Sequence, residues 1–262
     1  MSNPVFILAC GPRTGSTWLQ RVFTSTGEVL IWGESGILFP WGMLWTPDKP
    51  SQKFCFDDRN YEGVHSGRDL HAFRQKGANM WMAVLNPTYS DAFKAHRFYL
   101  EKLYGETAKR EGYPRWGAKE TIWGESTAEF AVNHSGGKVI FLTRKFEASF
   151  TSRFTGKAIQ NRTHENDVKL WCERWIKQHT YAFKHLGKEN VQYIHYEKLC
   201  DDEKVLLELL RWAGCKNPPD HTQCDAKISY HSSKDPVSEE DKVLIAPYKE
   251  EIDASTKRIE EL

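Results

Sequence analysis

The sequence lacks the patterns by which many proteins hold metals or bind extended polyanions. Its six cysteines form no C-x-x-C pair, and no His/Cys cluster has zinc-site spacing. We therefore expect reduced thiols and no metal site. The 36 basic residues nearly balance the 35 acidic ones, which disfavours a broad cationic surface for nucleic acid or long polysaccharides. Any anion-binding site is expected to be local.

Long hydrophobic runs are also missing. The start of the chain, Met1 to Cys10, has no basic segment and only about six apolar residues, too few for a signal peptide or a membrane span. We expect a cytoplasmic protein with no membrane partner. No feature of the sequence predicts an oligomeric state.

The composition is that of a globular enzyme. The 262 residues are 40% hydrophobic and 13% aromatic, enough for one sizeable core, so we expect a single domain over residues 1–262. Ten tryptophans exceed what packing usually requires, and we expect some to face a ligand.

Apolar runs and helical periodicities alternate along the chain. Strands are predicted at residues 5–9, 28–32, 115–119, 138–143 and 191–195. Helices are predicted at residues 14–26, 69–84 and 89–110, from about 146, around 168–186 and from 201–202. In the helix over 89–110, one face is expected to carry Phe93, His96, Leu100, Leu103 and Tyr104. Residues 33–67, rich in Pro, Gly and aromatics, form a loop or lid candidate. This order predicts an α/β fold with a central parallel sheet flanked by helices.

The segment CGPRTGSTW, Cys10 to Trp18, joins the first predicted strand to a helix. Such a turn aims backbone N–H groups and a helix dipole at one point, which suits an oxyanion. Gly15 and Thr17 fit the triphosphate-loop pattern G-x-x-x-x-G-K-[ST], but Ser16 replaces its lysine. The cation of the loop is instead Arg13, which disfavours a nucleoside triphosphatase.

A second anion site is predicted after the strand at 138–143. That strand ends in Arg144, where a kinase or triphosphatase would place an acid for Mg²⁺. Ser152, eight residues later, lies about two helical turns in and could join Arg144 on one phosphate. Two anion sites without a metal fit a nucleotide with separate 5′ and 3′ anions. The alternatives are a P-loop kinase for a small metabolite and a non-catalytic adenosine-nucleotide-binding protein.

These segments resemble the 3′-phosphoadenylyl sulfate (PAPS)-dependent sulfotransferases. Pro12–Trp18 is similar to their 5′-phosphosulfate loop, with an arginine as in the tyrosylprotein and many bacterial members. Phe141–Ser152 resembles their 3′-phosphate strand and helix, Arg115–Glu120 their G-x-K segment, and His195–Leu199 their Y-E-x-L segment. The four motifs follow the family's order over about residues 5 to 215.

The resemblance implies a P-loop-like three-layer fold and transfer of a sulfuryl group from PAPS to a hydroxyl or amine, with adenosine 3′,5′-bisphosphate (PAP) as product. The nucleotide-binding residues it implies are Arg13, Thr14, Gly15, Ser16 and Thr17 for the 5′-phosphosulfate, Trp18 for the adenine, Arg144 and Ser152 for the 3′-phosphate, and Tyr196, Ser233 and Lys234 as further contacts. Trp18 equally fits a core position. Gly156 stands where part of the family has a basic residue, and Arg153 is the candidate replacement.

Sulfuryl transfer passes through a loose in-line transition state, so catalysis is mainly positioning and charge neutralisation. Arg13 and Lys119 are the cations expected to do this. Glu34, just past the second strand, is the expected base, because Trp32–Ser35 resembles the segment that carries the catalytic glutamate in several members. His65 is the rival base, since the cytosolic branch uses a histidine.

The acceptor is expected to be a small molecule. Balanced charge disfavours long glycans, and the aromatic-rich segment at 33–67 favours a compact molecule with a ring or a cation. Asp57 and Asp58 in that segment would suit a cationic acceptor.

Overall fold

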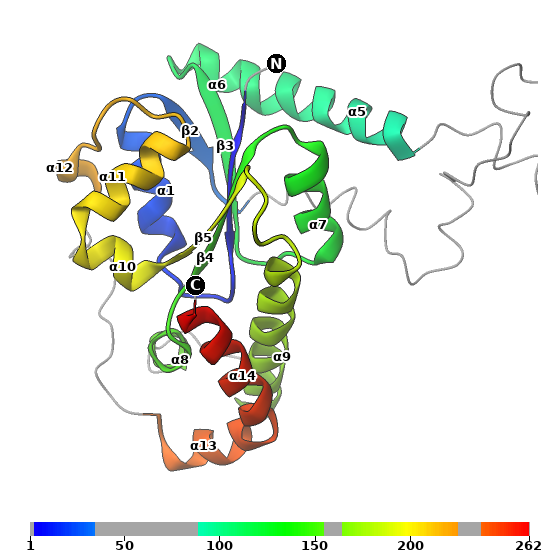
Figure 1. The fold of residues 1–262 in the computed structure, drawn as a ribbon, viewed down its shortest axis with the longest axis vertical. Helices are drawn as coiled ribbons and strands as arrows, with labels where there is room; N and C mark the ends of the chain where they lie inside the picture. The colour runs from blue at the N-terminus through cyan, green and yellow to red at the C-terminus, as the bar shows by residue number, and fades with distance from the viewer. Residues whose placement is uncertain (1–2, 35–88, 155–163, 225–236, 262) are drawn as a thin grey trace, which may run out of the picture.

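The computed structural model shows an α/β fold built around a parallel sheet (Figure 1). The structure describes residues 3–34, 89–154, 164–224 and 237–261. Residues 35–67 of the loop or lid candidate lie outside the described residues, and so does the helix predicted over 69–84.

The sheet contains five strands in the order β2-β3-β1-β4-β5, and every neighbouring pair is parallel. The strands are β1 (Val5–Ala9), β2 (Val29–Trp32), β3 (Arg115–Glu120), β4 (Lys138–Thr143) and β5 (Val191–His195). All five strand predictions are confirmed. β1 lies at the centre and is buried along its whole length, which explains its unbroken apolar sequence.

Helices follow most of the strands. They are α1 (Ser16–Ser25), α5 (Tyr89–Leu100), α6 (Glu106–Arg110), α7 (Glu125–Glu129), α8 (Phe146–Phe154), α9 (His164–Phe183), α10 (Tyr196–Asp201), α11 (Glu203–Trp212), α12 (His221–Cys224), α13 (Glu239–Ile245) and α14 (Lys249–Glu260). Three short turns are η2 (Glu101–Gly105) and η3 (Phe130–His134), both π-helical, and η5 (Ala246–Tyr248), a 3₁₀ turn. None of these helices is long and apolar enough to cross a bilayer.

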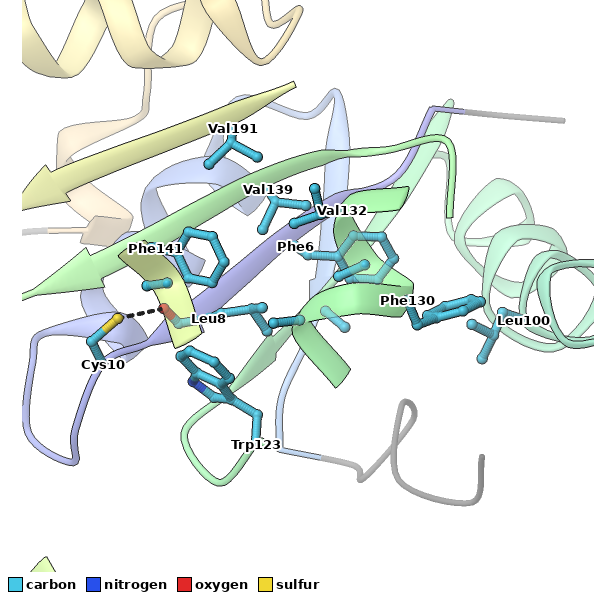
Figure 2. Packing of buried hydrophobic residues seen from close by; sticks show 14 of the residues in the cluster. Phe6, Leu8, Cys10, Leu100, Trp123, Phe130, Val132, Val139, Phe141 and Val191 are labelled. Atoms are coloured by element: carbon cyan, nitrogen blue, oxygen red, sulfur yellow. Dashed lines mark hydrogen bonds between the residues drawn. The ribbon is translucent and has the colours of Figure 1, made fainter. Parts of the chain in front are cut away.

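Helices cover both faces of the sheet (Figure 1). Alternate residues of β1 supply the two sides of the core: Val5 and Ile7 pack with α1 and α11, whereas Phe6 and Leu8 pack toward α5, α7 and η3. Figure 2 shows the second side, with Phe141 and Trp123 near Leu8. A third cluster joins α8, α9, α13 and α14. This arrangement confirms the predicted fold class.

The helix predicted over 89–110 is confirmed, but a π-helical turn interrupts it. In η2 the N–H of Glu106 donates to the carbonyl of Glu101, five residues back. On a continuous α-helix, Leu100 and Gly105 would lie about 140° apart; the wider turn brings both into the buried face. Leu103 is 45% exposed whereas Phe93, His96 and Leu100 are buried, so its predicted place on one face with them was wrong.

The helix predicted from residues 201–202 is confirmed as α11, and a helix that the sequence did not predict precedes it. A short helix, α10, already begins at Tyr196 and ends at Asp201. Asp202 is the N-cap of α11, and its carboxylate accepts a hydrogen bond of 2.8 Å from the N–H of Lys204. The C-terminal α13 and α14, for which the sequence made no prediction, pack against α9.

Candidate active site

The loop between β1 and α1 lies at the carboxyl edge of the sheet and has an unusual backbone. Gly11, Arg13 and Gly15 have φ angles of 101°, 64° and 82°, all in the left-handed region. Arg13 is the one non-glycine residue in the described part of the chain with a positive φ. A Cβ at position 15 would lie 2.2 Å from the ring of Tyr196, so both conformation and space require glycine there.

The loop ends at a helix N-terminus whose donors face outward. The N–H of Leu19 makes the first intrahelical bond, 3.1 Å to the carbonyl of Gly15. The N–H groups of Ser16, Thr17 and Trp18 therefore have no acceptor within the helix. Gly15, as N-cap, supplies no side-chain hydrogen bond. Free donors and the positive end of the helix dipole make this an anion-binding geometry.

Three predicted residues meet beside this N-terminus. Arg13 donates from Nε to Oγ of Ser152 on α8 at 3.2 Å. Arg144, just after β4, donates from Nη1 to the carbonyl of Arg13 at 3.0 Å. The sequence predicted Arg13 for one phosphate site and the pair Arg144 and Ser152 for another, and in the structure both Arg144 and Ser152 hydrogen-bond to Arg13.

Tyr196, at the start of α10, lies close to both Gly15 of the loop and Arg144. The guanidinium carbon of Arg144 is 5.2 Å from the centre of the Tyr196 ring, and its Nε is 4.0 Å from Oε1 of Glu197. The indole of Trp18 meets the same ring edge-on at 5.6 Å. Trp18 donates from Nε1 to the carbonyl of Cys224 at 2.8 Å and is only 7% exposed, so it is largely a core residue, and its contact with an adenine stays a prediction.

Glu34 and Lys119 form an ion pair on the other side of the loop. Their Oε1 and Nζ atoms are 2.6 Å apart, because the neighbouring parallel strands β2 and β3 end side by side. The Lys119 side chain is 5% exposed and that of Glu34 49%. Partial burial alone would raise the pKa of Glu34, but hydrogen bonding and charge from Lys119, with a hydrogen bond from Thr121, lower it below its usual 4.5. Glu34 is therefore ionised at neutral pH.

Other predicted residues fall outside the described part of the chain. These are Ser233 and Lys234 for the nucleotide, His65 as the rival base, Gly156, and Asp57 and Asp58 for the acceptor. Among the described residues, no group of His, Cys, Asp and Glu side chains is arranged to hold a metal ion.

The structure also identifies polar residues that the sequence did not single out. Ser149 on α8 donates from Oγ to the carbonyl of Pro12 at 2.6 Å. Gln178 on α9 accepts a hydrogen bond of 2.8 Å from the N–H of Gly11. Ser149 lies within the strand-helix motif and could have been found there as a buried serine three residues before Ser152. Gln178 belongs to no motif, so only the fold identifies it.

The loop fits an anionic nucleotide by its own chemistry. Thr14 Oγ1 is fully buried and makes no hydrogen bond within the described residues, so the loop has an unused polar atom. The outward N–H groups of α1 and two partly buried guanidinium groups, Arg13 and Arg144, supply further donors. Charge-assisted hydrogen bonds from such groups suit phosphate and sulfate oxygens.

The chain was compared with known proteins. Similar solved structures include the sulfotransferase domain of the Synechococcus PCC 7002 olefin synthase (18% identity, TM-score 0.45, covering 89% of this chain and 81% of that one). A sulfotransferase from Alicyclobacillus acidocaldarius is similar at 14% identity and TM-score 0.46, covering 97% of this chain and 96% of that one. The sulfotransferase domain of the curacin biosynthetic pathway has 14% identity and TM-score 0.43, with 95% and 98% covered. No curated protein matches this sequence.

Family membership rests on the sequence itself. The sequence profile described as "Sulfotransferase family" matches residues 4–219, which include the loop, Glu34, Lys119, Arg144, Ser152 and Tyr196. This chain belongs to the sulfotransferase family.

Proposed function

We propose that this sulfotransferase uses PAPS as donor, releases PAP, and transfers the sulfuryl group to a hydroxyl or amine of a small molecule. One observation carries the proposal: Arg144 and Ser152 both hydrogen-bond to Arg13 beside the uncapped N-terminus of α1. This cluster offers two cations and several donors to one ligand, as a nucleotide with anions at both ends requires.

Each donor-side residue has a distinct task in the proposal. Arg144 and Ser152 bind the 3′-phosphate, and the main-chain N–H groups of residues 14–17 bind the 5′-phosphosulfate. Arg13 exchanges its hydrogen bond to Ser152 for an oxygen of the ligand. The bound nucleotide supplies an activated sulfuryl group. Tyr196 positions the nucleotide through its contacts with Gly15 and Arg144.

Glu34 is the proposed base. Its lowered pKa keeps the carboxylate ionised at neutral pH, and its half-exposed side chain is accessible to an acceptor. The acceptor's proton passes to a Glu34 oxygen as the acceptor's oxygen or nitrogen bonds to sulfur, and the bond between sulfur and the 5′-phosphate oxygen breaks, so that PAP leaves with that oxygen. The Lys119 ammonium group pairs with Oε1 of the Glu34 carboxylate and adds positive charge near the reacting oxygens.

A small acceptor, and one domain over residues 1–262, are part of the same proposal. The small acceptor rests on the balanced charge and the aromatic-rich segment at 33–67, and the single domain rests on the chain length and hydrophobic content.

The test compares ligands by thermal shift. PAP without metal should raise the melting temperature, because a ligand at 100 times its Kd stabilises by about 2.7 kcal/mol. AMP, which lacks the 3′-phosphate, should raise it less. Stabilisation by ATP with Mg²⁺ but not by PAP would favour a kinase and overturn the proposal. PAPS labelled in its sulfate then identifies the acceptor among candidate hydroxyl and amine compounds.

A further inference from the structure

Gln178 is a buried glutamine that joins three backbone segments. It lies on α9 and is 1% exposed. Its Oε1 accepts from the N–H of Gly11 at 2.8 Å, and its Nε2 donates to the carbonyls of Thr121 at 3.1 Å and Trp123 at 3.3 Å. All three partners are main-chain groups near the carboxyl edge of the sheet.

The partners fix the orientation of the amide and explain why a glutamine is needed. An N–H requires an acceptor, and two carbonyls require donors, so Oε1 must face Gly11 and Nε2 the other two groups. A charged glutamate would place a negative oxygen against two carbonyls. Methionine, of similar length, would leave the three groups without this partner.

The segments that Gln178 joins belong to the two halves of the site. Gly11 begins the loop that carries Arg13. Thr121 follows β3, two residues after Lys119, whose Nζ lies 2.6 Å from Oε1 of Glu34. A second buried bond ties the same segments together, since Trp123 Nε1 donates to the carbonyl of Ala9 at 2.7 Å.

We propose that Gln178 is a positioning residue, which sets the distance between the donor-binding loop and the Glu34–Lys119 pair. The inference rests on the proposed function, because it assigns the loop to the donor and the pair to the acceptor. In-line transfer depends on that distance, and a misplacement of about 1 Å can cost about 100-fold in rate.

The first test is Gln178→Met in the full chain. We expect kcat to fall about 10- to 100-fold while the Kd for PAP changes less than about threefold, because the loop itself still binds the nucleotide. Gln192→Met is the matched control. Gln192 is half-buried on β5, two strands from β1, and this variant should keep the wild-type kcat. Wild-type kcat for folded Gln178→Met would overturn the proposal.

Gln178→Glu provides a second, pH-dependent test. At neutral pH the introduced carboxylate repels the two carbonyls, so kcat should be low. Protonation restores one donor and one acceptor, so kcat relative to wild type should recover as the pH falls. A purely structural role would lower the melting temperature but leave kcat per folded molecule and its pH dependence unchanged. If the proposed function is wrong, wild type fails with PAPS; if only this inference is wrong, wild type works and Gln178→Met works equally well.

Discussion

The proposed donor side and the proposed acceptor side of the site are built differently. On the donor side, backbone geometry fixes the groups: Gly15 admits no side chain, and Ser149 and Arg144 hold two loop carbonyls. The acceptor side depends on one ion pair, in which Lys119 is buried and Glu34 is half exposed. Under the proposed function, this difference gives a rigid binding loop for a constant donor beside a more exposed surface on which acceptors can vary.

Removing the base should give the largest effect. Glu34→Gln keeps the size of the side chain but cannot take a proton, so kcat should fall about 10²- to 10⁴-fold with the Kd for PAP nearly unchanged. In wild type, kcat/KM should fall as the pH drops below the usual glutamate pKa of 4.5, because the lowered pKa keeps the carboxylate charged above that point. Steady-state kinetics and PAP titrations measure both quantities.

The control for this variant is another glutamate–lysine pair. Glu125 pairs with Lys184 on the surface, so Glu125→Gln should leave kcat unchanged. If Glu34→Gln kept the wild-type kcat, Glu34 would not be the base. The Glu34–Lys119 pair could then only bind the acceptor.

Gly15→Ala tests the rigidity of the donor side. The new Cβ would meet the Tyr196 ring at a φ of 82°, so the free energy of unfolding should fall by about 2–5 kcal/mol. Gly27→Ala is the matched control, because Gly27 has a φ of 73° but no atom within 4 Å. In Gly27→Ala the free energy of unfolding should fall only by the cost of a left-handed φ for alanine, about 1–2 kcal/mol. Urea unfolding measures both free energies of unfolding. If the two variants lost the same amount, the ring of Tyr196 would not restrict position 15.

Arg144→Ala should give the smallest of these effects. Loss of a charge-assisted hydrogen bond costs about 1.5–3 kcal/mol, so PAP should bind about 10- to 150-fold more weakly. AMP binding should change little, since it lacks the 3′-phosphate. Lys145→Ala, which removes the exposed neighbouring cation, is the control. Equal weakening of PAP and AMP would mean that Arg144 acts through the Arg13 carbonyl rather than on the 3′-phosphate.

The fold could be predicted largely because its signals are local. Buried parallel strands read as short apolar runs, and Gly27 marks the end of α1 with its left-handed φ. Leu103 could not be placed correctly, because a π-helical turn changes the periodicity without a sequence signal of its own.

The site was predictable to the extent that it consists of motifs. Arg13, Arg144 and Ser152 lie in contiguous segments with fixed spacing. Glu34 and Lys119 were each identified, but their ion pair joins residues 85 apart in the chain and depends on β2 lying beside β3. Gln178 contacts Gly11 across 167 residues, and such a contact follows only from the folded chain.

The π-helical turn η2 also has a consequence for chain length. An α-helix would need one residue fewer than η2 to keep the same residues facing the core. The extra residue can be assigned to Leu103, which is exposed. Deleting Leu103 would join α5 and α6 into one continuous α-helix, in which Leu100 and Ala108 would still face the core. We therefore expect the chain to tolerate deletion of Leu103 with Leu100 and Ala108 still buried.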